Sequence, residues 1–209
     1  FDNIMAISAA KMANGSADLT MTYTASVVTG TADTQVLSVS NLTGGTFTAD
    51  GTENLTISSS LAKSTLAGAA SDALKTVTVT GDQNLTITAA LDFASNGTAS
   101  SAGVAAVAGA VVDASAFTGA LTMTTTASEI FDIKGGSGAD TFNLASLTKD
   151  DKVDGGAGDD TALITVHDAA GGALKMSTLQ FSNLENFSVE ATNNKETSIN
   201  ADGTTVTNI

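Results

Sequence analysis

Two glycine-rich stretches hold the residues of this chain that are best suited to bind an ion. Positions 135–142 read Gly-Gly-Ser-Gly-Ala-Asp-Thr-Phe, and positions 155–162 read Gly-Gly-Ala-Gly-Asp-Asp-Thr-Ala. Both fit the pattern G-G-x-G-x-D-x-U, in which U is a large apolar residue, although the second copy has alanine at that place. Glycine allows turns in which backbone carbonyl oxygens converge, and the sixth-position aspartate adds an anionic oxygen. Because calcium prefers about six to eight oxygen ligands, the two stretches predict a calcium site.

The spacing of the two stretches is informative, because they are offset by 20 positions. Two nonapeptide units span about 18 residues in a roll, so this offset predicts that both loops lie on one edge, one above the other. We expect the carboxylates of Asp140 and Asp160 to be the main ligands. The predicted site also includes the carbonyl groups of Gly135, Ser137, Gly156 and Gly158, together with Gly138 and the auxiliary carboxylates of Asp154 and Asp159. Ile133 and Val153, two positions before each glycine pair, should point into the core.

A plain glycine turn that binds no ion is the alternative interpretation. The chain has 22 acidic residues against 8 lysines and no arginine, which gives a net charge of −14. Such a charge repels itself, so either it keeps the chain highly soluble or cations neutralise some of the carboxylates. Two copies of the motif at a stackable spacing in so acidic a chain favour calcium over the plain turn.

Composition argues against several other functions. No basic footprint for a nucleic acid is present, and the longest run of small apolar residues, 103–112, is far shorter than the roughly 20 residues of a membrane helix. His167 is the only histidine and cysteine is absent, so a serine triad or a zinc cage is not expected. Asp159 and Asp160 could be the acid and base of a glycosidase, but one tyrosine and no tryptophan leave a sugar without an aromatic platform. We expect no enzyme.

The elements that must position the glycine stretches are short β-strands. The chain has 20 glycines, no proline and alternating runs such as Thr76-Val77-Thr78-Val79-Thr80, which favour stacked strands with tight turns. Residues 51–58 resemble residues 81–88, and residues 1–6 resemble residues 184–189. Turn-and-strand units that recur without a helical period are typical of a solenoid. The predicted fold is therefore all-β, an irregular parallel β-solenoid.

Period-2 alternation locates the individual strands. The predicted strands are 19–23, 35–40, 54–58, 74–80, 84–88, 121–125, 130–133, 141–144, 161–166, 184–190 and 204–209. Residues 61–72 could form a short helix or a loop, and residues 95–110 are expected to be a loop. Three segments follow: a degenerate solenoid over 1–129, a calcium-binding roll over 130–166 and further solenoid strands over 167–209.

The two nonapeptides also point to a family. Together with Val112-Asp113-Ala114-Ser115-Ala116-Phe117-Thr118-Gly119 upstream and Phe181-Ser182-Asn183-Leu184-Glu185-Asn186-Phe187-Ser188-Val189 downstream, they resemble bacterial S-layer proteins with RTX repeats, the Caulobacter-type surface-layer proteins. The resemblance implies an RTX β-roll, type I secretion to the extracellular surface, calcium-driven folding and a lattice of identical copies.

Other arrangements within this class stay open at this point. The chain could instead be a calcium-stiffened stalk segment of an RTX adhesin, or the calcium-binding tail of a secreted hydrolase. Cell-surface polysaccharide is a possible partner through other regions, and neither nucleic acid nor membrane insertion is expected. Phe1 in place of methionine suggests a fragment of a longer protein.

Overall fold

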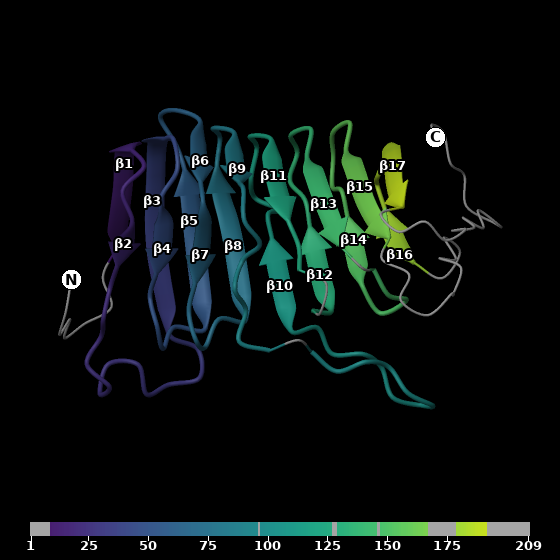
Figure 1. Cartoon of the computed structure of the whole chain (residues 1–209), viewed down its shortest axis with the longest axis horizontal. Helices are drawn as coiled ribbons and strands as arrows, with labels where there is room; N and C mark the ends of the chain where they lie inside the picture. The colour runs from purple at the N-terminus through teal and green to yellow at the C-terminus, as the bar shows by residue number, and fades with distance from the viewer. Residues whose placement is uncertain (1–8, 96, 127–128, 146, 167–178, 192–209) are drawn as a thin grey trace.

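The structure is a computed structural model, and it describes residues 9–95, 97–126, 129–145, 147–166 and 179–191. These residues form an all-β parallel solenoid without a helix, which confirms the predicted fold class. Strands stack along one long axis, from β1 at one end to β16 and β17 at the other (Figure 1). No helix that is long and apolar enough to cross a membrane occurs in this part of the chain.

Two large parallel sheets face each other, and a small third sheet closes the early turns. The eight-stranded sheet runs, in spatial order, β1 (Ala10–Gly15), β3 (Thr34–Leu42), β5 (Asn54–Ser59), β8 (Thr76–Gly81), β10 (Ala110–Asp113), β12 (Phe131–Lys134), β14 (Lys152–Asp154) and β16 (Gln180–Ser182). The six-stranded sheet runs β17 (Asn186–Ala191), β15 (Thr161–Val166), β13 (Thr141–Ala145), β11 (Leu121–Thr124), β9 (Leu85–Ile87) and β6 (Ser64–Leu66). The three-stranded sheet consists of β2 (Leu19–Thr20), β4 (Thr46–Thr48) and β7 (Gly68–Ala70).

The core consists of apolar columns that run along the stack. Alternation places every second side chain inside, and parallel pairing in register places each one directly above its equivalent in the previous turn. One such column is Leu55, Val77, Val112, Ile133 and Val153, all buried. The predicted inward positions of Ile133 and Val153 are thus confirmed, and both residues lie directly before the glycine turns that they hold in place.

Most predicted strands are present, with boundaries that differ by a few residues. The predicted short helix or loop at 61–72 is wrong, because this stretch forms β6 and β7. Ser64 and Leu66 point inward on either side of Thr65, and β6 pairs with β9 in register. Pairing and burial along the stack therefore override the weak local helix preference of this alanine-rich stretch. The predicted strand at 204–209 and His167 lie outside the described residues.

The predicted loop at 95–110 contains a β-hairpin, which we call the arm (residues 97–109). Antiparallel bridges join Thr98 to Val107 and Ser101 to Val104. The arm extends from the lower edge of the solenoid, beneath the strands from β10 onward (Figure 1). Both sheets continue in register on either side of the arm. Strand pairing also continues across the predicted segment boundaries, because β10 pairs with β12 and β15 pairs with β17. The described strands of the three predicted segments thus lie in one stack.

Candidate metal site at the stacked glycine turns

The two glycine stretches lie one above the other on the upper edge, as their 20-residue spacing predicted. The amide of Ala157 donates to the carbonyl of Gly136 at 2.9 Å, and the strands that follow pair Thr141 with Thr161. Gly156 has a φ of +94°, and a Cβ there would lie 2.2 Å from the Gly136 carbonyl oxygen. Only glycine fits this position, because any side chain would force the turns apart.

Asp140 is fully buried and uses both of its carboxylate oxygens. Oδ1 accepts a hydrogen bond from the Leu121 amide in the turn before, and Oδ2 accepts one from the Gly136 amide in its own turn, each at 2.7 Å. Burial raises the pKa of this carboxyl group, while the two amides oppose the rise. Asp140 therefore links its own turn to the turn before, and it closes the glycine loop of its own turn.

Asp160 repeats only half of this arrangement. It is also fully buried, and its Oδ1 accepts a hydrogen bond from the Asp140 amide at 2.7 Å. Its Oδ2, in contrast, is buried without a hydrogen-bond partner among the described residues. Burial raises the pKa of Asp160 to about 6, and the charges of Asp140, Glu185 and Asp159 add to the rise. An anionic oxygen is thus enclosed without a donor among the described residues, within the electrostatic reach of three other carboxylates.

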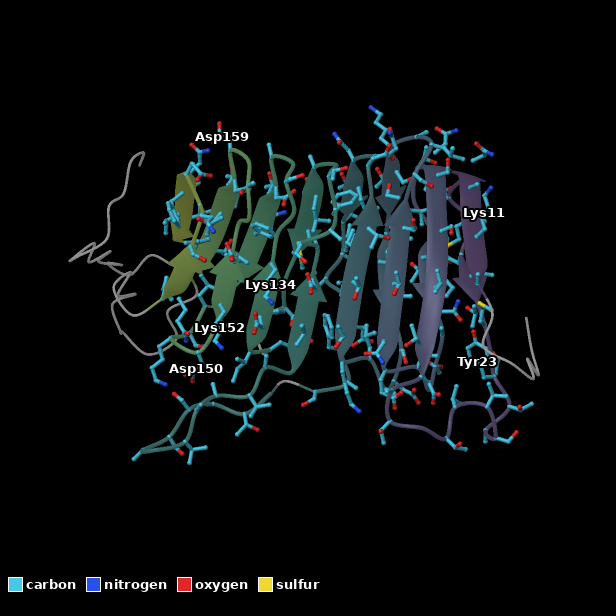
Figure 2. The ribbon with its side chains drawn as sticks, turned by 180° about the vertical axis from the view of Figure 1, so that it is seen from behind. Lys11, Tyr23, Lys134, Asp150, Lys152 and Asp159 are labelled. Carbon is cyan, nitrogen blue, oxygen red and sulfur yellow. The ribbon has the colours of Figure 1, made fainter. Side chains whose placement is uncertain are left out.

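The auxiliary residues of the predicted site lie further out. Asp154 accepts hydrogen bonds from the Gly156 amide at 3.2 Å and from Asn183 at 2.7 Å. Asp159 is exposed on the upper edge (Figure 2) and accepts a hydrogen bond from Asn186 at 2.6 Å. Ser137 is exposed, and its amide donates to the Phe117 carbonyl at 2.9 Å. Within the described ranges, no three acidic, histidine or cysteine side chains converge on one point.

A structural role of the acidic residues was missed by sequence reasoning. Carboxylates repeatedly accept a backbone amide from the turn before, which we call a carboxylate clip. Glu185 accepts the Asp160 amide at 2.8 Å, Glu53 accepts the Asp33 amide at 2.9 Å, and Asp151 accepts the Phe131 amide at 2.9 Å. An acid immediately before a strand, as in Glu53-Asn54 and Glu185-Asn186, is the sequence signal. Part of the −14 charge therefore has a hydrogen-bonding purpose that needs no ion.

Asp113, in the turn upstream of the first nonapeptide, bonds within its own turn. Its Oδ1 accepts hydrogen bonds from the Ser115 amide at 3.0 Å and the Ser115 hydroxyl at 2.6 Å. These bonds lower its pKa. Such a self-contained turn explains the residue without a ligand.

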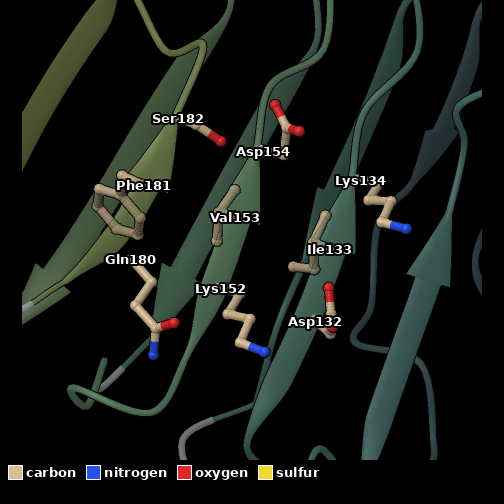
Figure 3. Close-up of a pocket in the computed structure, with 9 residues that line it drawn as sticks. All are labelled: Asp132, Ile133, Lys134, Lys152, Val153, Asp154, Gln180, Phe181 and Ser182. Atoms are coloured by element: carbon tan, nitrogen blue, oxygen red, sulfur yellow. The ribbon is translucent and has the colours of Figure 1, made fainter.

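A shallow groove of about 460 Å³ runs along the outer face of β12, β14 and β16 (Figure 3). Registered residues of opposite charge line it, with Asp132 beside Lys152 and Lys134 beside Asp154. Opposite charges on neighbouring strands stabilise a sheet. The charged residues that line the groove are therefore explained by strand pairing.

Comparison of the chain with protein-family models, with curated proteins and with solved structures finds no match. An account of its function has to be built from the chain's own residues.

Proposed function

We propose that this chain is a calcium-ordered structural module of a bacterial surface layer, in which copies of the chain assemble with one another outside the cell. The role is mechanical and not catalytic: calcium stiffens the later turns, and the stiffened solenoid is the unit of assembly. The resemblance to S-layer proteins with RTX repeats and the stacked nonapeptide turns support this proposal.

The observation that supports calcium most directly is the Asp160 carboxylate. A buried polar atom without a hydrogen bond costs about 1–3 kcal/mol, and more when it is charged. The Oδ2 atom of Asp160 is buried without a partner in the described structure, and three neighbouring carboxylates raise its energy further. A divalent cation would remove both costs, because it supplies a ligand for this oxygen and positive charge for its neighbours.

The residues around Asp160 fit an oxygen-bound ion. A Cβ on Gly155 would lie 1.8 Å from the Asn183 carbonyl oxygen and 2.7 Å from Asp160 Oδ2, so glycine lets this carbonyl oxygen approach the carboxylate. Asp140 is the other carboxylate of the proposed site, and its oxygens retain lone pairs beyond the amides that they accept. Carbonyl groups of the glycine turns would complete the ligand set. The described part of the chain offers neither thiolate nor imidazole here, which suits calcium better than zinc.

Thermal unfolding with calcium and with EDTA tests the proposal. If the affinity is about 0.1 mM, 10 mM calcium should stabilise the folded chain by roughly 2.7 kcal/mol per site. Asp160→Asn should remove most of this gain, whereas the matched control Asp82→Asn changes an exposed acid of an early turn and should keep it. Identical unfolding curves in calcium and in EDTA would reject the calcium role. Equal losses in both variants would indicate diffuse counter-ion binding and not a site.

A further inference from the structure

The arm differs from the rest of the surface in its charge. No charged residue occurs between Asp92 and Asp113 in a chain with a net charge of −14. Val104 and Val107 of the arm expose 59% and 62% of their surface, and alanine and glycine make up most of the hairpin around them. A protruding segment that is both apolar and uncharged is unusual on so acidic a protein, and exposed apolar surface of this kind marks interaction sites.

The arm is held in a defined position through Ser100, close to the hairpin tip. The Ser100 amide and hydroxyl donate to the two carboxylate oxygens of Asp150 at 3.0 and 2.5 Å, and Lys149 pairs with the same carboxylate at 2.8 Å. These contacts join residues 50 positions apart. The Lys149 and Ser100 contacts lower the pKa of Asp150 to about 2, so the attachment persists at neutral pH. The arm is therefore presented in one direction, which favours binding.

A second uncharged surface lies on the early turns. The outward residues of β3, β5 and β8 are Thr34, Val36, Ser38, Ser40, Asn54, Thr56, Ser58, Thr76, Thr78 and Thr80, and none carries a charge. We call this surface the hydroxyl face. Val36, 37% exposed, lies in register with Thr56, which lies in register with Thr78. On β12 and β14, in contrast, the outward positions are Asp132, Lys134, Lys152 and Asp154.

We propose that the arm of one copy docks on the hydroxyl face of a second copy. Two bodies of charge −14 can approach most closely where neither presents a charge, because no ion is then desolvated and repulsion is weakest. The arm runs under β10 and the later strands, away from the hydroxyl face of its own chain (Figure 1). The contact therefore joins different copies. Because the two surfaces differ, it is head-to-tail and can extend without closing on itself.

This inference rests on the proposed assembly role and deepens it. It does not involve the metal site, because Asp159 marks the upper edge and Asp150, the attachment of the arm, the lower edge (Figure 2). Variants of the arm should thus separate assembly from calcium-dependent folding.

Sedimentation velocity in calcium tests the docking. Val104→Asp in the arm and Val36→Asp on the hydroxyl face should each raise the concentration needed for assembly by about tenfold or more. Thr88→Asp, which adds the same charge at an exposed position outside both surfaces, should assemble like the unchanged chain. An equimolar mixture of the Val104→Asp and Val36→Asp chains should form a one-to-one heterodimer and nothing longer, since only one intact arm and one intact face can meet.

Unchanged assembly of either variant, or a mixture that stays monomeric, overturns the docking. Unfolding curves with calcium and EDTA on the same samples report separately on the proposed calcium role, and the three variants should keep the calcium response of the unchanged chain. An unchanged chain that gains stability from calcium but stays monomeric overturns both the docking and the surface-layer role, while the calcium site stands.

Discussion

The early turns, before the arm, and the later turns, after it, build the same stack by different means. A turn such as β5, β6 and β7 has three strands, whereas β12 and β13 complete a turn with two strands and a glycine loop. Between early turns, neutral links occur beside carboxylate links: the Ser64 and Ser71 hydroxyls accept the amides of Leu42 and Thr52, and the Glu53 carboxylate accepts the Asp33 amide. Between later turns, the carboxylates of Asp140, Asp160 and Glu185 form consecutive links, one turn above the next. A neutral hydroxyl satisfies an amide at little electrostatic cost, but stacked carboxylates repel one another. We therefore expect the later turns to depend more on cations.

The largest effect that would sharpen this comparison is expected from Asp140→Ala in excess calcium. The change leaves the amides of Leu121 and Gly136 without acceptors in a buried place, at a cost of about 1–3 kcal/mol for each amide. Ser64→Ala removes the acceptor of a single amide through a neutral bond of 3.3 Å, so it should cost about 1 kcal/mol. Urea unfolding of both variants gives the two free energies. Equal losses would contradict the assigned difference between carboxylate and hydroxyl links.

Gly156→Ala should have the next largest effect. An alanine at a φ of +94° is strained by about 1–3 kcal/mol, and its Cβ would meet the Gly136 carbonyl. Gly15→Ala in β1 is the matched control, since a Cβ there has no atom within 4 Å. The melting temperature should fall for Gly156→Ala and stay nearly unchanged for Gly15→Ala. A stable Gly156→Ala protein would show that the glycine turns need not stack closely.

A smaller effect is expected from pH. The pKa of Asp160 rises from 3.8 to about 6 on folding, so the folded chain holds this proton more tightly than the unfolded chain does. Without calcium, the contribution of Asp160 to stability should therefore be largest near pH 4 and decline as the pH rises through 6. Melting temperatures measured in EDTA between pH 4 and 7 test this. Asp160→Asn should flatten the decline, and so should calcium; a decline that persists in the variant would assign it to other acids.

Much of this fold follows from patterns that the sequence displays openly. Strands such as β5 and β15 show enough alternation to be recognised, although the six residues of β1 were not, and the 20-residue spacing of the nonapeptides predicted their stacking. The strands β6, β7 and β14 have three residues each, too few to show a period. Their conformation comes from neighbours above and below, which are remote in the sequence.

Two further features depend on three-dimensional position. The similar stretches 51–58 and 81–88 were recognised as repeats, yet β5 and β9 belong to opposite sheets, because an offset of 30 residues is not a whole turn. The positions of Asp140 and Asp160 were predicted as ion ligands, but their hydrogen bonds to amides of the preceding turn could not be. The motif indicates which oxygens gather at the edge, whereas the register of the strands decides which donors reach them.

The arm also shows how the lower edge could be used in engineering. Asn54 pairs with Thr76 across 22 residues, whereas Thr76 pairs with Val111 across 35 residues, and the register continues. Lengthening a flexible loop by less than a factor of two costs less than about 0.6 kcal/mol in closure entropy. The hairpin tip around Gly103 is therefore a natural grafting position, at which a foreign peptide could be displayed while the stack on both sides keeps its fold.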